Sequence, residues 1–368
     1  MDGKFLKKRK NWFARHKFFT VMILLLLILV LTVIGYVWSK LNLIQYDSGK
    51  TVPAETSAHA PEAEVSLPAE TEETEPGQLV DISGLEISET EPPIPEADVE
   101  EHAEIINILL IGTDEHSREF STNARSDSMI LVSINKDKKT VKLVSLERGM
   151  GVPILEGENA GEWDLLTHIF RYGGAELLTK TVEHCFNIEV DHYVRVNFTT
   201  VISAIDAIGG IEMELTGAEA GSLNRTYESS LVAGVNHLDG YMALGFARLR
   251  KIDSDWQRVV RQRKVITAVV EKLKGSSFSE LNDLLNQVLP LVQTNMTKLD
   301  IAKLMLYSPH FLTSTFDQMT IPKQGTYGGM TGLYGRDLFA VDFEVNNQIL
   351  WDFLYGEETE ETQQTQTP

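Results

Sequence analysis

The fold is decided by the stretch Ile105-Ile106-Asn107-Ile108-Leu109-Leu110-Ile111, which ends in Gly112-Thr113-Asp114. A short apolar run that stops at turn residues is typical of a buried strand. Residues 127–134 and 140–146 have the same character, and the polar Asn135-Lys136-Asp137-Lys138-Lys139 between them predicts a hairpin turn. Three strands at the start of the folded region therefore predict the beginning of a sheet.

Helical and strand patterns alternate further along the chain. A helix over 174–186 precedes a strand over 192–198, and Thr199 or Thr200 can cap a helix that stops at Gly209-Gly210. More helices are expected at 239–248, 255–273, 278–292, 299–312 and 342–353, with a strand at 318–321. This alternation predicts an α/β fold of the α-β-α type, with a mixed central sheet flanked by helices.

The first part of the chain predicts a membrane anchor. Residues 1–17 form a basic tail, and residues 18–38 form an uncharged run of mostly Leu, Ile and Val. About 20 apolar residues span a hydrocarbon core roughly 30 Å thick, and Trp38-Ser39-Lys40-Leu41 offers no signal-peptide cleavage site. Since positive charge stays in the cytoplasm, we expect one transmembrane helix with everything after it on the cell-wall side.

An acidic spacer is expected after the anchor, over residues 39–104. From Asp47 onwards it contains about 17 Asp and Glu residues but only Lys50 as a cation, and it supplies most of the net charge of −20. Such composition favours disorder because too little apolar surface can be buried. The folded domain is then expected over 105–356, followed by a disordered tail over 357–368. The overall acidity thus belongs to linkers and says little about a functional site.

The stretch Ala247–Arg263 is dense in charge. It contains six cations and two aspartates, namely Arg248, Arg250, Lys251, Asp253, Asp255, Arg258, Arg261 and Arg263. Such a block can be a solvated helix face with weak i,i+4 pairs. Alternatively it binds a multiply anionic group such as a pyrophosphate, because guanidinium groups bind phosphate oxygens in pairs and keep their charge.

Charged residues also stand where the expected strands begin and end. Asp114 follows the first strand, Arg125 and Asp127 open the second, and Arg148 closes the third. Ligands gather at strand ends in open α/β sheets. Together with the arginine block, these residues predict one shared anionic site. The single cysteine, Cys185, excludes an internal disulfide, and we expect it in the core.

Several motifs then resemble the LytR-CpsA-Psr family, over roughly residues 105–325. They are, in order, Ile108–Asp114, Arg125–Met129, Val144–Arg148, Tyr172–Leu178, Val196–Phe198, Ile208–Ile211, Leu238–Leu244 and the Arg248–Arg263 block. The resemblance implies a Mg²⁺-dependent envelope phosphotransferase. Such proteins move a glycopolymer, for example wall teichoic acid or capsule, from a polyprenyl pyrophosphate carrier to peptidoglycan. It also implies an apolar tunnel between sheet and helices for the carrier's chain.

The resemblance assigns roles to individual residues. It implies that Asp114 and Asp127 hold the metal, and that Arg148 and Asp253 or Asp255 are catalytic. The residues that would bind the pyrophosphate are Arg125, Arg148, Arg248, Arg250, Arg258 and Gln262. Arg258 and Gln262 are four residues apart, so both would lie on one helix face.

Two positions depart from the family pattern. The family usually has Ser-Ile-Pro-Arg-Asp where this chain has Ser145-Leu146-Glu147-Arg148-Gly149, and a family lysine is replaced by Asp164. These changes motivate an alternative, a non-catalytic membrane-tethered protein that holds polyprenyl phosphate or organises the envelope. Nucleic acid is not an expected partner, because no helix-turn-helix signal is present and the domain lies outside the cell.

Overall fold

A computed structural model of the protein describes residues 32, 35–47, 80–94, 104–115, 120–121, 124–249, 252, 255–311 and 316–356. Of residues 255, 278 and 305–311 it describes the backbone alone. The basic tail, most of the expected anchor, most of the expected spacer and the C-terminal tail lie outside these residues. The chain divides into two compact units, Met1–Ile44 and Gln45–Pro368.

In the first unit, residues 35–41 are helical, and the Lys40 ammonium lies 5.2 Å from the centre of the Tyr36 ring. Among the residues that the structure describes, no helix is both long and apolar enough to cross a bilayer. The transmembrane helix over 18–38 therefore stays a prediction.

The second unit is built on a mixed seven-stranded sheet in the order β1-β10-β7-β2-β3-β4-β11. The strands are β1 (Gln45–Tyr46), β10 (Gln293–Thr294), β7 (His192–Asn197), β2 (Ile105–Thr113), β3 (Ser126–Asn135), β4 (Thr140–Leu146) and β11 (Phe316–Ile321). Strand β2 pairs in parallel with β7 and antiparallel with β3, and β3 pairs antiparallel with β4. The expected fold class, a mixed sheet between helices, is confirmed.

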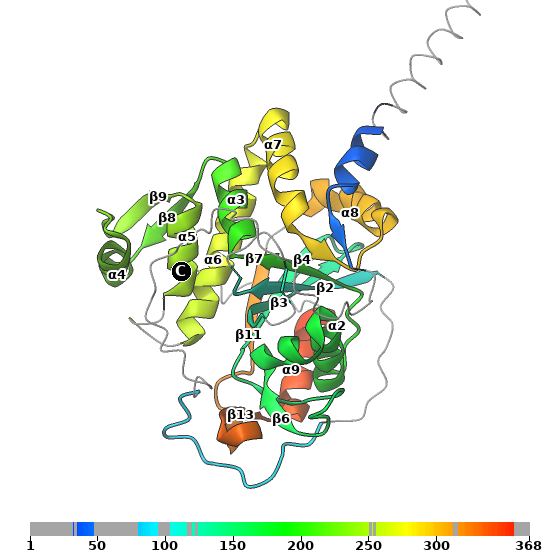
Figure 1. Cartoon of the computed structure of the whole chain (residues 1–368), viewed down its shortest axis with the longest axis vertical. Coiled ribbons are helices and arrows are strands. Elements are labelled where there is room, and N and C mark those ends of the chain that lie inside the picture. Colours follow the sequence, from blue (N-terminus) through cyan, green and yellow to red (C-terminus); the bar gives the residue numbers. More distant parts are fainter. Residues whose placement is uncertain are drawn as a thin grey trace, which may run out of the picture. The chain divides into compact units, whose positions relative to one another are not determined.

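Helices cover both faces of this sheet (Figure 1). The helices of this unit are α2 (Leu166–Phe186), α3 (Phe198–Ala207), α4 (Gly217–Tyr227), α5 (Gly240–Arg248), α6 (Asp255–Lys274), α7 (Phe278–Val288), α8 (Lys298–Phe311) and α9 (Phe343–Tyr355), of which α4 packs on α5 and β8. Three small antiparallel pairs complete the unit: β5 (Gly151–Pro153) with β6 (Trp163–Leu165), β8 (Ile211–Leu215) with β9 (Gly234–Leu238), and β12 (Tyr327–Thr331) with β13 (Asp337–Val341).

Alternate residues of β2 serve different cores, as the period of two in a strand requires. Leu109 and Ile111 are fully buried in the core that α2 and α9 cover. Ile108 belongs to a second core on the opposite face, where Leu110 and Ile266 of α6 pack. A third apolar cluster, around Phe246 of α5, joins α3, α4 and α6 to β8 and β9. The run of apolar residues is therefore continuous because both faces of β2 are covered.

Helix termini follow from local chemistry. Asn197 caps α3, since its side chain accepts a hydrogen bond from the Thr200 amide in a capping box. The expected caps were Thr199 or Thr200, so the cap lies earlier than predicted. Helix α2 begins at Leu166, before the expected 174, and it is broken at Gly174, whose φ of 67° favours glycine. The buried Cys185 of α2 packs in the main core as expected.

The folded unit reaches further towards the N-terminus than the sequence indicated. The pair Gln45–Tyr46 forms strand β1 beside β10, and Val80, Ile82 and Leu85 pack against the main core. Ser88 also donates a 2.7 Å backbone hydrogen bond to Gly329. The expected single spacer over 39–104 is therefore wrong for these residues. The mean composition of the acidic stretch predicted disorder, but it did not reveal that Val80, Ile82 and Leu85 can pack on the main core.

The central strand makes a stability prediction. Leu109→Ala removes a fully buried side chain and should lower the free energy of unfolding by about 2–5 kcal/mol, because it leaves a cavity. Leu299→Ala is the matched control, since Leu299 is 64% exposed and its loss should change stability by less than about 0.5 kcal/mol. Urea unfolding of both variants measures the difference. Equal losses would contradict the central position of β2.

Candidate functional site

Four strand termini meet at one edge of the sheet. The carboxyl ends of β2 and β7 lie together because these strands are parallel, with Thr113 opposite Asn197. Strand β3 runs the other way, so its first residue, Ser126, also lies opposite Thr113. Strand β4 runs antiparallel to β3 and ends at Leu146, opposite Met129. The expected gathering of charged residues at strand ends follows from this topology.

A cavity opens at this edge, between the sheet and helices α3, α5 and α6. Its empty space is about 860 Å³, the open solvent at its mouth included. It is lined by Leu110, Gly112, Thr113, Asp127, Ser128, Val196, Asn197, Phe198, Val201, Leu244, Ala247, Arg248, Arg258, Gln262, Val265 and Ile266. Aliphatic and aromatic groups make most of this wall, and a smaller set of polar groups includes two arginines. The cavity therefore suits a ligand with an apolar body and an anionic end.

Two members of the arginine block face this cavity. Arg258 is buried, 2% exposed, and Arg248 lies with its guanidinium carbon 4.6 Å from the centre of the Phe198 ring. Gln262 lines the same wall one turn after Arg258, and its side-chain oxygen accepts a 3.0 Å hydrogen bond from Ser128. The predicted common face of Arg258 and Gln262 is confirmed.

Two ion pairs stand at the same edge of the sheet. Arg148 Nη1 lies 3.1 Å from Asp127 Oδ1, and Asp127 lines the cavity. Arg125 binds Asp114 twice: its Nε donates to Oδ2 at 3.0 Å and its backbone amide to Oδ1 at 2.9 Å. Asp114 and Asp127, the two predicted metal ligands, are therefore each paired with an arginine that is predicted to bind phosphate.

Two further arginines of the block, Arg261 and Arg263, have structural partners. Arg261 is buried and donates to Glu219 Oε1 at 3.0 Å and to the Leu249 carbonyl at 2.7 Å. Arg263 donates to Ser145 Oγ at 2.6 Å and to Thr320 Oγ1 at 2.8 Å, which fastens α6 to β4 and β11. Burial lowers the pKa of Arg263. The charge-dense block therefore divides between the cavity and the core.

Three predicted residues cannot be placed by their side chains. Arg250 and Asp253 lie outside the described residues, and only the backbone of Asp255, the first residue of α6, is described. The roles of Arg250 in phosphate binding and of Asp253 or Asp255 in catalysis stay predictions.

The chemistry of the two carboxylates fits a magnesium ion in part. Mg²⁺ is usually held by one or two carboxylates, with phosphate oxygens and waters completing six ligands. Asp114 and Asp127 supply that number. Within the described ranges, no group of three or more His, Cys, Asp or Glu side chains could hold a metal by itself. Two carboxylates of this kind would therefore need phosphate oxygens and waters to complete the ligands of a Mg²⁺ ion.

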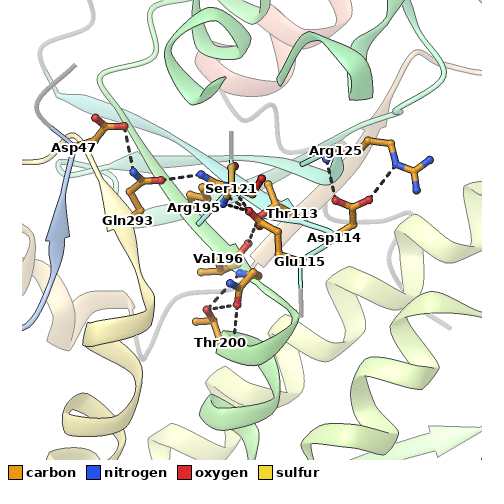
Figure 2. Close-up of polar contacts among 11 residues, drawn as sticks. Asp47, Thr113, Asp114, Glu115, Ser121, Arg125, Arg195, Val196, Thr200 and Gln293 are labelled. Atoms are coloured by element: carbon orange, nitrogen blue, oxygen red, sulfur yellow. Dashed lines mark hydrogen bonds and ion pairs between the residues drawn. The ribbon is translucent and has the colours of Figure 1, made fainter. Parts of the chain in front are cut away.

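A buried arginine that was not predicted from the sequence lies on the other face of the sheet. Arg195 of β7 is 4% exposed and lies 2.5 Å from Glu115, the residue after Asp114 (Figure 2). A signal was present, because Arg195 alternates with Tyr193 and Asn197, which are also buried, so the charge lies on an inward face. Burial lowers the pKa of Arg195, and Glu115 opposes that shift.

Neither departure from the family pattern is among the residues that line the cavity. A Cβ atom at Gly149 would lie 2.9 Å from Phe339 Cε2 and 3.0 Å from Val80 Cγ2, so packing occupies the place of a side chain. Asp164 is fully buried and accepts hydrogen bonds from Tyr172 at 2.6 Å and from Arg336 at 2.7 Å. Both residues belong to the core around β5, β6 and β13.

Asp164 holds a buried polar network together. His168 Nδ1, one turn later, lies 3.1 Å from Asp164 Oδ1, so His168 has a structural role. Burial raises the pKa of Asp164, but hydrogen bonds with His168 and Tyr172 outweigh it, and the pKa lies below its ordinary value. Burial, with the nearby Asp164, raises the pKa of Tyr172 to about 12.

Comparison with known proteins gives consistent results. A profile of the LytR_cpsA_psr family matches residues 71–348. A polyisoprenyl-teichoic acid–peptidoglycan teichoic acid transferase TagU of Bacillus anthracis is 33% identical over 202 residues, 53% of this chain and 62% of that relative. The protein of the same name from Enterococcus faecalis is 34% identical over 257 residues, 67% of this chain and 80% of the relative. With the B. anthracis relative, the chain thus shares less than two thirds of that protein's length.

Solved structures share the fold. The structure described as TagT bound to LIIa-WTA superposes with a TM-score of 0.54 at 28% identity, over 68% of this chain and 91% of that one. The architecture of sheet and helices described above is therefore one that known proteins of similar sequence adopt.

The Asp164 network predicts a dependence of stability on pH. Because folding lowers the pKa of Asp164, its stabilisation is complete above the unfolded pKa of about 4 and is lost as the pH falls through the folded value. Asp164→Asn should cost about 1.5–3 kcal/mol at pH 7, and the difference from the unmodified protein should shrink below pH 4. Urea unfolding between pH 7 and pH 3 measures both.

Tyr172→Phe is the companion variant, since it removes one donor and leaves Arg336 in place. At pH 7, Tyr172→Phe should lower the free energy of unfolding by less than Asp164→Asn does. A constant difference between Asp164→Asn and the unmodified protein over the whole pH range would show that the ionised carboxylate does not stabilise the fold.

Proposed function

The chain belongs to the LytR-CpsA-Psr family, and on this premise we propose that it transfers a glycopolymer from a polyprenyl pyrophosphate carrier to peptidoglycan. The polymer is a wall teichoic acid, a capsule or a related polysaccharide. The names of the two TagU relatives describe this type of reaction, with teichoic acid as the polymer. The proposed product is a polymer joined to a sugar of peptidoglycan through one phosphate.

The cavity is the observation that carries the proposal. A polyprenyl chain is wholly apolar and its pyrophosphate carries several negative charges. The cavity offers an aliphatic wall that includes Leu110, Leu244 and Ile266, and Arg248 and Arg258 also line it. Apolar burial holds the chain of the carrier, and paired hydrogen bonds from arginine orient its phosphates.

The chemistry needs positioning more than a covalent intermediate. A sugar hydroxyl of peptidoglycan attacks the phosphorus that bears the glycopolymer. A new O–P bond forms, the bond to the bridging oxygen breaks, and polyprenyl phosphate leaves. Arg148, Arg258 and Arg125 stabilise the charge that spreads over the phosphate oxygens. Asp253 or Asp255 takes the proton of the hydroxyl.

A magnesium ion would be held by Asp114 and Asp127. When bound, it neutralises phosphate oxygens and makes phosphorus easier to attack. The ion pair between Arg148 and Asp127 keeps that carboxylate at the wall of the cavity, beside the place proposed for the phosphates.

The protein acts at the cell membrane in this proposal. The apolar run at 18–38 anchors it once, with the N-terminus in the cytoplasm and the folded unit on the cell-wall side. Both substrates are found there, since the carrier lies in the membrane and peptidoglycan lies outside it. The non-catalytic alternative rested on Gly149 and Asp164, and both residues have packing roles away from the cavity wall.

A transfer assay tests the proposal. The full-length protein in detergent receives a polyprenyl pyrophosphate-linked glycan, peptidoglycan fragments and Mg²⁺, and the joined product is measured. Arg258→Ala and Arg148→Ala should each lower turnover by about 10²-fold or more, because an aligned donor to phosphate oxygen is lost. Arg225→Ala, at an exposed arginine of α4, is the matched control and should keep full turnover.

Bound lipid without product in the unmodified protein would favour the non-catalytic alternative. Unchanged turnover in Arg258→Ala and Arg148→Ala would overturn the assigned roles of these two arginines.

A second assay tests the cation. Chelation by EDTA should abolish transfer, and added Mg²⁺ should restore it. Asp127→Asn should raise the Mg²⁺ concentration needed for half-maximal turnover by about tenfold or more, since a neutral amide is a weaker ligand than a carboxylate. Asp239→Asn is the matched control, because asparagine caps α5 as well as aspartate does. Full turnover in EDTA would exclude the magnesium ion from the proposal.

A further inference from the structure

We propose that Arg195 is a positioning residue, which acts from the far face of the sheet to hold Asp114 and Arg125 at the edge where the cavity opens. The inference rests on the proposed function, because it concerns the reaction of that site. It also makes a claim about local structure that can be tested without any reaction.

Arg195 is surrounded by protein on all sides. Its guanidinium donates to Thr113 Oγ1 at 3.3 Å, to Gln293 Oε1 at 3.0 Å, to Glu115 Oε1 at 2.5 Å and to the Ser121 carbonyl at 2.6 Å. The ring centres of Phe120 and Phe170 each lie 4.5 Å from its central carbon. A guanidinium with this many protein partners is built to hold other groups in place.

Arg195 does not contact the cavity. Its neighbour Val196 lines the cavity, whereas Arg195 contacts Phe170 of α2, which packs in the main core. Val196 points to the opposite face from Arg195, and Asn197, on the same face as Arg195, reaches the cavity only at the end of the strand. Arg195 can therefore affect the site only through residues that it holds.

The residues that it holds are next to Asp114 (Figure 2). Glu115 and Thr113 flank Asp114 in the chain, and both are hydrogen-bonded to Arg195. Glu115 also accepts a hydrogen bond from the Ser121 amide at 2.6 Å. With its two neighbours fixed on one side, the Asp114 carboxylate is left facing Arg125. Glu115 therefore pairs with Arg195, and the adjacent Asp114 pairs with Arg125. In the proposed arrangement, the contact between Arg195 and Glu115 fixes this pairing.

Sequence distance strengthens this reading. Arg195 lies about 80 residues after Glu115 in the chain, yet it bonds to both Glu115 and Ser121, which bound the start of the segment between Asp114 and Arg125. The base of that segment is closed by the 3.2 Å backbone hydrogen bond from the Asp114 amide to the Arg125 carbonyl. Arg195 therefore fastens the segment at a second point, and the Asp114–Arg125 pair lies beside it.

The test uses the full-length double variant Arg195→Met/Glu115→Gln. Substituting both partners avoids a buried unpaired charge, so the protein should remain folded. The turnover number should fall by about 10²-fold while the KM for the lipid-linked donor stays unchanged, since misplacement at a reacting centre costs rate rather than binding. Amide hydrogen exchange should rise at Ser121 and Arg125, whose amides are bonded to Glu115 and Asp114.

A double-mutant cycle separates positioning from general destabilisation. If Arg195 acts through Asp114, the double substitution should lower the turnover number little further in a protein that already carries Asp114→Asn. Arg263→Met is the matched control. Arg263 is another buried arginine, but it bonds to β4 and β11, so its effect should add to that of Asp114→Asn.

Two outcomes would overturn the inference. Unchanged exchange at Ser121 and Arg125 would show that Arg195 does not hold the segment. A raised KM with an unchanged turnover number would make Arg195 a determinant of donor binding instead. If the unmodified protein has no turnover, the proposed function fails. The exchange measurement still shows whether Arg195 holds the residues around Asp114 in place.

Discussion

The directions of four neighbouring strands are the constraint on which the rest of the molecule depends. Strands β7 and β2 run in parallel, and β3 and β4 alternate in direction after them. This arrangement places the carboxyl ends of β7, β2 and β4 and the amino end of β3 along a single edge of the sheet. A wholly parallel or wholly antiparallel order would have divided these termini between two edges. Both faces of β2 pack against apolar clusters, with Leu109 and Ile111 on one side and Ile108 on the other, so this central strand joins two cores.

Buried arginines are used in two different ways in this fold. Arg195, Arg261 and Arg263 are each surrounded by acceptors from the protein, and they join elements that are distant in sequence. Arg258 is buried too, but it lines a cavity large enough for a ligand. Charge density in the sequence cannot distinguish the two uses, since both need a guanidinium with little exposure to water. The geometry of the partners makes the distinction.

Sequence reasoning predicted the parts of the fold that depend on long patterns. The apolar run before Gly112 and the spacing of Arg258 and Gln262 each carry their own signal, and both were placed correctly. Strand β1 was missed because two residues, Gln45 and Tyr46, have no pattern, and they become a strand only when β10 pairs with them. For Arg195, alternation with Tyr193 and Asn197 indicates burial, but its hydrogen-bond partners lie 74 to 98 residues away and no local pattern identifies them.

The two departures from the family pattern show how a substitution acquires meaning from its surroundings. On sequence alone, an aspartate replaced by Gly149 looks like a lost functional group. In the structure, Phe339 and Val80 fill the space that a side chain would need, and Val80 comes from a segment that composition assigned to a spacer. Asp164 likewise replaces a cation, but Arg336 brings a positive charge to within 2.7 Å of it. In both places residues far away in the chain fill the space or balance the charge, and neither position belongs to the cavity wall, which carries Arg248 and Arg258.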